Sequence, residues 1–372
     1  MAVEFYRHSL GEEEAEIFRK ALSGTMLTTG HYAHEAENRF QEYLGISHCV
    51  VLDSCTAALH LALLACDIGP GDEVITTPMT FVATANSVLM TGAKPVFVDV
   101  EKATGNIDAK LIEAAITPRT KAIMPVHLYG HLCDMQKIKM IADRHGLAVI
   151  EDAAHCIEGI RDSVRPGRLG TCACFSFYAT KNVTCGEGGM LATNDAAFAA
   201  RVRRLSCHGI DKTAYDRYGK SYKHWDVVEL GWKYNLDNLR ASLLIPQIPK
   251  IDRKRNLREK VCRHYEKAFD AMGLEYPIVL PGTTSARHMQ SFWIQSQKRD
   301  ETLLAMQEKG IGVAVNYRVL TDLKYFKDTF SFKRGLFPEA ERIGDSTITV
   351  PLYPDLTLES VDEVLRVLKK CL

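Results

Sequence analysis

The chain has 372 residues, 46% of them hydrophobic, which is enough to bury the cores of two domains or of one large and one small domain. Its 46 basic and 46 acidic residues balance, which argues against a general polyanion binder, so we expect no nucleic-acid partner. The first residues lack a signal pattern, and no run reaches about 18 uninterrupted apolar residues. We therefore expect a soluble, cytoplasmic protein without a membrane partner.

The cysteine content points to a reducing compartment rather than to disulfides or a metal site. There are eleven cysteines, an odd number, and they are dispersed without a C-x-x-C pair. Cys172 and Cys174 lie in a strand-like run, where alternation sends both sulfurs to one face. We interpret them as small buried hydrophobes rather than ligands.

Short β-rich runs alternate with helical runs through the first part of the chain. The patterns predict strands over residues 49–54, 72–77, 94–100, 121–127 and 147–153, and helices over residues 56–66, 81–90, 110–116 and 135–145. This rhythm is typical of an α/β fold with a mainly parallel sheet covered by helices.

The sequence pattern changes after about residue 245. Residues 251–273 are highly charged, with apolar residues at helical spacing, and residues 358–372 read as an amphipathic helix. We predict a large domain over residues 1–245, followed by a linking helix and a small C-terminal α/β domain over residues 246–372.

One lysine stands where a buried strand is expected to meet a glycine-rich turn. Residues 175–189 read "FSFYATKNVTCGEGG", an apolar strand that runs into Lys181, with Ser176 five residues upstream. Lysine is costly to desolvate, and burial lowers its pKa toward the reactive neutral amine. Lys181 therefore either reaches solvent or takes part in chemistry.

Other candidate groups follow the predicted strands, where ligands of parallel α/β sheets gather. The turn at residues 54–56 opens a helix whose free N–H groups suit a phosphate, although Thr56 is equally explained as a helix cap. Asp152 either caps the following helix or holds a pyridine nitrogen protonated. Phe81 offers a flat surface for a ring, although an aromatic residue there is more often core. A lysine, a carboxylate, a phosphate cup and a flat surface are what pyridoxal 5'-phosphate (PLP) requires.

Five segments resemble successive motifs of the DegT/StrS family, which contains PLP-dependent nucleotide-sugar aminotransferases. The segments are "GDEVITTPMTFVATAN", "PVHLYGHLCDM", "IEDAAHCIEG", "FSFYATKNVTCGEGGM" and "GWKYNLDNLRASL". The resemblance extends in order over nearly the whole chain, from "MLTTGHYAHEAENRF" to "VPLYPDLT". It implies the aspartate aminotransferase fold, PLP fold type I, with PLP in the large domain.

The resemblance also implies roles for residues around the cofactor ring. Lys181 is expected to form the Schiff base with PLP and to act as the acid and base of the reaction, and Asp152 to pair with the ring nitrogen. Phe81 is expected to stack on the ring. His155 stands at a position where the family usually has Gln or His and is expected to lie close to the cofactor.

Further residues are implied to hold the cofactor phosphate. They are Thr56, the backbone of Cys55, and Ser176. Cys55 replaces the Gly or Ala usual at its position, a modest change if only its backbone is used. Asn235 matches an asparagine that reaches the phosphate of the neighbouring subunit, which implies a homodimer with shared active sites.

The family resemblance implies L-glutamate as amino donor, released as 2-oxoglutarate, and a nucleotide-linked keto sugar as acceptor in polysaccharide or lipopolysaccharide biosynthesis. A 4-keto sugar is favoured, with a 3-keto sugar or a cyclitol ketone as alternatives. Residues 208–226 are polar and basic, so Arg217 and Lys220 are candidates for gripping the diphosphate, although a solvated loop explains them equally well. Further candidate substrate contacts are Asn316, Tyr317 and Arg318, and Asn316 stands where close relatives often carry His.

Several competing interpretations are weaker. A PLP-dependent sugar dehydratase has His in place of Lys181, and a non-catalytic sensor or scaffold leaves the set of cofactor groups unexplained. A dehydrogenase requires a G-x-G-x-x-G spacing that "GEGG" lacks. His127 and His131 have no third ligand at a sensible spacing, so we interpret them as structural and expect no metal. Residues 12–16, "EEEAE", are expected to form a solvated helix face.

Overall fold

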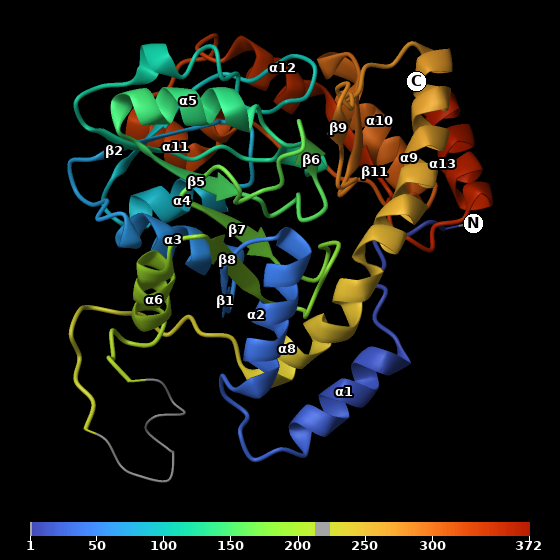
Figure 1. The fold of residues 1–372 in the computed structure, drawn as a ribbon. Helices are drawn as coiled ribbons and strands as arrows, with labels where there is room; N and C mark the ends of the chain where they lie inside the picture. Colours follow the sequence, from blue (N-terminus) through green and yellow to red (C-terminus); the bar gives the residue numbers. More distant parts are fainter. Residues whose placement is uncertain (1, 213–223) are drawn as a thin grey trace.

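The computed structural model describes residues 2–212 and 224–372. A seven-stranded sheet lies at its centre, in the order β1-β8-β7-β5-β4-β2-β3 (Figure 1). The strands are β1 (His48–Leu52), β2 (Glu73–Thr76), β3 (Lys94–Phe97), β4 (Thr120–Ile123), β5 (Ala148–Asp152), β7 (Cys172–Ser176) and β8 (Gly189–Thr193). Neighbours from β3 to β7 pair in parallel, whereas β8 is antiparallel to β7 and to β1. The mainly parallel α/β fold predicted from the sequence is confirmed.

Helices cover both faces of this sheet, as its continuous apolar strands require. They are α2 (His31–Leu44), α3 (Cys55–Ala65), α4 (Ala83–Met90), α5 (Met135–His145), α6 (Ala196–Leu205) and α8 (Asn238–Leu244), whereas α1 (Glu12–Leu22) packs against α8. Short 3-10 turns lie at Glu113–Ala115, Leu128–Gly130, Ile245–Lys250 and Leu320–Asp322. No helix within the described ranges is long and apolar enough to cross a bilayer.

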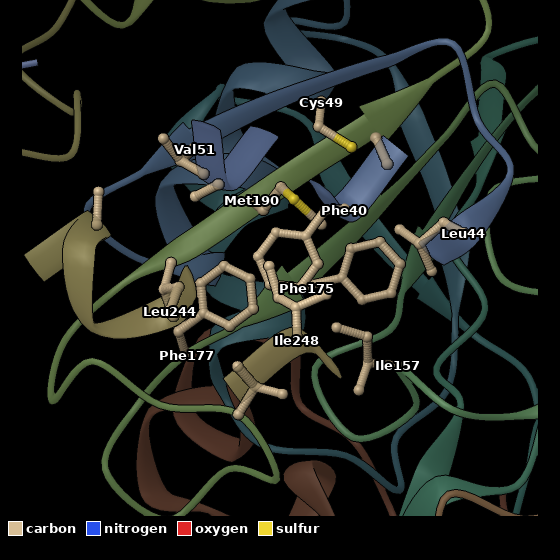
Figure 2. Close-up of a cluster of buried hydrophobic side chains, with 14 of the residues drawn as sticks. Phe40, Leu44, Cys49, Val51, Ile157, Phe175, Phe177, Met190, Leu244 and Ile248 are labelled. Carbon is tan, nitrogen blue, oxygen red and sulfur yellow. The ribbon is translucent and has the colours of Figure 1, made fainter. Parts of the chain in front are cut away.

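Strand β7 shows how alternation builds the two cores. Ala173 and Phe175 face one hydrophobic cluster, which also contains Phe40 and Phe177, with ring centroids 5.1 Å apart (Figure 2). Cys172 and Cys174 face the cluster on the opposite side, beneath α3 and α6. Both sulfurs therefore lie on one face as predicted.

A smaller assembly follows α9 (Ile251–Met272), a long helix that connects it to the central sheet (Figure 1). It contains the antiparallel pair β10 (Gln290–Trp293) and β11 (Thr347–Val350), with α10 (Ser296–Glu308), α12 (Pro338–Ser346) and α13 (Leu358–Cys371). Helix α11 (Lys324–Phe330) instead packs through Phe326 against Phe97 of β3. The short strands β6 (Ile160–Arg161) and β9 (Thr283–Thr284) pair separately. Val3 packs into the core around α9 and α13, so the N-terminus joins the C-terminal part. The boundary placed at residue 245 stays a prediction.

Three local expectations are wrong. Residues 110–116 form only a 3-10 turn, because the apolar run is short and Pro118 disfavours helical geometry at the residue before it. Strand β7 ends at Ser176, so Lys181 lies in the loop beyond it. Glu14 departs from the predicted solvated face: it is 2% exposed and its carboxylate accepts a 2.7 Å hydrogen bond from the Gly11 amide at the start of α1, whereas Glu12, Glu13 and Glu16 are exposed as predicted.

Candidate active site

The site forms beyond the carboxyl ends of β5 and β7, where Lys181 lies in the loop after β7. Its backbone N–H donates to the Tyr178 carbonyl at 2.9 Å, which closes a turn. Lys181, Ser176 and His155 line one small cavity, together with residues of the 153–157 segment. Burial lowers the pKa of Lys181 to about 8, against the opposing attraction of Cys55 and Asp152. Lys181 therefore has a markedly acidified amine inside the fold, as chemistry at this residue requires.

Asp152 is the last residue of β5 and is 5% exposed. Its Oδ2 accepts a 2.7 Å hydrogen bond from the Thr84 hydroxyl, and its Oδ1 accepts one of 3.1 Å from the Ala154 amide. Burial raises its pKa, and the Thr84 and Ala154 hydrogen bonds together with the charge of Lys181 oppose that rise. The structure thus brings the predicted carboxylate and the predicted amine into one electrostatic unit.

Two histidines and a tyrosine surround the lysine. The Lys181 Nζ lies 3.4 Å from His288 Nε2, and the ring centroids of His288 and His155 are 4.5 Å apart. The Tyr317 hydroxyl lies 3.3 Å from His155 Nε2. Burial is the main reason that the pKa of both histidines falls well below its ordinary value, and the positive charge of Lys181 adds to it. Both imidazoles are therefore neutral at physiological pH.

The turn proposed for phosphate binding lies close to the carboxyl end of β1. Ser54 caps α3, because its hydroxyl accepts a 3.1 Å hydrogen bond from the Ala57 amide, so Thr56 is not the cap. A Cβ on Gly189 would lie 2.2 Å from the Ser54 carbonyl carbon, which explains why glycine starts β8 here. The turn at residues 54–56 therefore packs directly against β8, the strand that pairs with β7. Thr56 and the Cys55 amide thus belong to the first turn of α3.

Phe81 is not core. It precedes α4 and is 55% exposed, with its ring centroid 5.8 Å from that of Tyr317. An exposed aromatic ring beside the lysine site is available to stack on a flat ligand.

The remaining predicted residues lie farther from the lysine or outside the described ranges. Asn235 pairs with Leu52, the last residue of β1, and its side chain donates to the Thr29 hydroxyl at 2.7 Å. The Asn316 carbonyl accepts a 2.6 Å hydrogen bond from the Tyr129 hydroxyl, and Arg318 is exposed. Arg217 and Lys220 belong to residues 213–223, which lie outside the described residues.

The other histidines singled out from the sequence have structural positions. His127 is fully buried and its Nε2 lies 2.8 Å from Glu151 Oε2, whereas His131 is buried and its backbone carbonyl accepts from Asn106. Burial lowers the pKa of His131 to about 3.

Reasoning from the sequence missed two residues that contact the predicted pair. Thr84 holds Asp152 across 68 positions, and His288 approaches Lys181 across 107 positions. In the sequence, Thr84 is visible only as a hydroxyl within an apolar segment, and His288 only as an imidazole just before one. Neither feature identifies a partner.

The side chains present fit PLP. His155 Nδ1 is buried without a hydrogen-bond partner among the described residues, as expected for an atom that meets a ligand. Lys181 would provide the amine, Asp152 the carboxylate for the ring nitrogen, and Phe81 the flat surface. The first turn of α3 would provide N–H groups for the phosphate. Fold and site together define a PLP-dependent aminotransferase of fold type I.

Comparison with known proteins identifies the family. The description "DegT/DnrJ/EryC1/StrS aminotransferase family" matches residues 8–369. The chain belongs to this family and is a sugar aminotransferase, which takes an amino group from an amino acid and gives it to a keto sugar. The family resemblance inferred from the motifs is confirmed, as is PLP as cofactor.

Similar proteins agree with this assignment. The chain is 39% identical to the spore coat polysaccharide biosynthesis protein SpsC of Bacillus subtilis, over 97% of this chain and 94% of SpsC. Among solved structures, the PLP-form of Spr1654 from Streptococcus pneumoniae, described as a sugar aminotransferase, has a TM-score of 0.92 and 26% identity over 100% of both chains. PseC of Helicobacter pylori, an aminotransferase involved in pseudoaminic acid biosynthesis, has a TM-score of 0.93 and 26% identity over 100% of this chain and 99% of PseC.

Proposed function

We propose that the protein transfers the amino group of L-glutamate to a nucleotide-linked sugar, and that the acceptor is a 4-keto sugar. The observation that carries the proposal is the acidified amine of Lys181 beside Asp152, within a chain of the sugar aminotransferase family. SpsC and PseC, which are similar to it, are named for polysaccharide and pseudoaminic acid biosynthesis, in keeping with a sugar acceptor.

Lys181 and Asp152 have different roles in the proposed reaction. With a pKa of about 8, Lys181 has about one amine in ten neutral at pH 7, so it can both take and return a proton. Bound PLP supplies an electron-accepting ring that stabilises negative charge next to the transferred nitrogen. Asp152 contributes a buried carboxylate, positioned by Thr84, whose negative charge favours a protonated ring nitrogen. Ser176, Thr56 and the Cys55 amide would hold the phosphate.

We also propose that the protein works as a homodimer in which Asn235 reaches the neighbouring site. The segment before Asn235 supports this, because several of its apolar side chains are exposed in the single chain: Trp225 is 46%, Val228 57% and Leu230 79% exposed. A second subunit would bury such a surface. Cytoplasmic location is proposed because all eleven cysteines are free thiols.

The nucleotide is proposed to bind through the basic segment at residues 208–226. Arg217 can grip a phosphate with two parallel hydrogen bonds, and Lys220 can meet it as a point charge. Glutamate needs neither, so the two half-reactions separate. We expect Arg217→Ala and Lys220→Ala to weaken nucleotide-sugar binding while leaving the glutamate half-reaction, followed by cofactor absorbance, nearly unchanged. Lys324→Ala, a control at an exposed lysine on α11, should change neither. Equal effects on both half-reactions would instead favour the interpretation of the segment as a solvated loop.

The acceptor is tested directly with a panel of nucleotide-linked 3-keto and 4-keto sugars and a cyclitol ketone. Each is incubated with the PLP-loaded protein and L-glutamate or L-glutamine, and the products are analysed by mass spectrometry. Amination of a 4-keto sugar nucleotide with glutamate supports the proposal. Exclusive amination of a 3-keto sugar or a cyclitol would overturn the acceptor, and exclusive use of glutamine would overturn the donor.

A further inference from the structure

His288 lies between the reactive lysine and a neighbouring amide. One ring nitrogen, Nε2, is 3.4 Å from Lys181 Nζ, and the other, Nδ1, is 3.2 Å from Asn182 Oδ1. The residue is 7% exposed, so water does not replace these partners freely. The hydrogen that a neutral imidazole carries is therefore placed by these two contacts.

The orientation of the Asn182 amide follows from its other partners. Its Nδ2 lies 3.1 Å and 3.0 Å from the two carboxylate oxygens of Glu158, and 3.1 Å from the Ala286 carbonyl oxygen. All three atoms are acceptors, so only the NH₂ group of Asn182 can face them. The amide oxygen consequently faces His288, and the alternative flipped amide is excluded.

An arginine fixes the far end of this network. The Arg258 Nη2 lies 2.5 Å from Glu158 Oε1, and both side chains are 2% exposed. Arg258 also donates to the carbonyl oxygens of Ala286 and Arg287 at 3.1 Å and 2.9 Å. Helix α9 thereby fixes the segment that carries His288 as well as the carboxylate that orients Asn182.

These contacts select one tautomer of His288. Because an amide oxygen only accepts, Nδ1 must carry the hydrogen, which leaves the Nε2 lone pair facing Lys181. A second proton on the ring is disfavoured: burial lowers the pKa of His288 well below its ordinary value, and nearby Lys181, His155 and Arg258 lower it further. His288 is therefore a fixed acceptor and not a competing acid.

We propose that His288 is a positioning residue that holds the free amine of Lys181 by accepting its hydrogen bond, in a tautomer fixed by Asn182, Glu158 and Arg258. The proposal rests on Lys181 being the lysine that carries the cofactor. When the amine is released, it keeps a partner inside the site and remains aligned for the next proton transfer. The lysine thus does not need to be repositioned during each catalytic cycle.

In the protein without cofactor, His288 is expected to change the pKa of Lys181. An acceptor stabilises an ammonium more than a neutral amine, so His288 raises the pKa of Lys181 above the value that burial alone gives. Cys55 and Asp152 act in the same direction, while burial opposes them. Removing the acceptor therefore lowers the pKa of Lys181 by about one unit.

The test measures this pKa in the apoprotein. Competitive acetylation from about pH 6 to about pH 10, with the Lys181 peptide quantified by mass spectrometry, gives the pKa of the amine. His288→Phe keeps a ring but removes the acceptor, His288→Gln retains an acceptor, and Asn182→Leu removes the partner that fixes the tautomer. His60→Phe is the matched control, because His60 is also a buried histidine, 2% exposed, and its ring packs against Trp232 and Tyr234.

We expect His288→Phe and Asn182→Leu to lower the pKa of Lys181 by about one unit and to slow the glutamate half-reaction about tenfold. The KM for glutamate should change little, and His288→Gln and His60→Phe should stay close to the unmodified protein. A folded His288→Phe protein with an unchanged pKa overturns the positioning role, as does failure of His288→Gln to restore it. An unchanged pKa of Lys181 in Asn182→Leu overturns the tautomer assignment. If His288→Phe does not fold, the pKa of Lys181 in Asn182→Leu and His288→Gln tests the positioning role instead. Borohydride labelling of a lysine other than Lys181 would instead overturn the cofactor assignment.

Discussion

Replacement of Lys181 by methionine should make the apoprotein more stable at pH 7. The pKa of Lys181 falls from 10.5 to about 8 in the folded chain, mainly because of burial. The unfolded chain therefore binds this proton more tightly, and below pH 8 the whole difference favours unfolding. Methionine keeps much of the apolar stem and removes the charge. The variant would also be inactive, so stability and function are opposed at this residue.

The magnitude follows from the same values. Each pKa unit corresponds to about 1.4 kcal/mol, so a fall from 10.5 to about 8 lowers the free energy of unfolding by at most about 3–4 kcal/mol at pH 7. This is an upper limit, because Lys181 keeps some contact with solvent. The penalty declines as the pH rises through 8 toward 10.5, and about 1 kcal/mol remains at pH 10.

The assay is urea unfolding of the apoprotein at about pH 7 and about pH 10, for the unmodified protein and Lys181→Met. Lys139→Met serves as control, because Lys139 pairs with Asp143 on the surface of α5 and its loss should change stability by less than about 1 kcal/mol. A Lys181→Met protein that is no more stable at pH 7 would refute the reasoning. So would a gain that is equal at both pH values, because the gain would then not come from ionisation.

Three further predictions concern the site and its support. Borohydride reduction of the PLP-loaded protein should fix the cofactor to the Lys181 peptide, and mass spectrometry that finds it on another lysine would contradict the cofactor assignment. Asp152→Asn should still bind PLP but slow both half-reactions by at least about a hundredfold, since an amide does not supply the negative charge; near-normal rates by cofactor absorbance would mean that another carboxylate serves the ring. Arg258→Met should lower the free energy of unfolding in urea by about 3–5 kcal/mol, because it leaves the Glu158 carboxylate buried without its cation. Arg263→Met, at an exposed arginine on the same helix, should cost less than about 1 kcal/mol, and equal costs would argue against the buried pair.

Local pattern was sufficient for the architecture and for the two central residues. The alternation of β-rich and helical runs predicted the mainly parallel sheet, because strand and helix periodicities depend on neighbours only a few positions apart. Lys181 and Asp152 were candidates because each follows an apolar run at which a parallel strand ends, and motifs in order along the chain predicted their chemistry. The structure brings both to the same site.

Tertiary structure alone decided how these groups are held and which exposed residues face them. His288 reaches Lys181 and Thr84 reaches Asp152 only because the chain folds back over 107 and 68 positions. Phe81 lies in an apolar context that suggested core, yet it is 55% exposed because the loop before α4 turns it toward Tyr317. Burial, the tautomer of a histidine and the pKa of an amine are set by atoms that arrive from distant segments. Periodicity records none of them, because it describes only which side of its own element a residue faces.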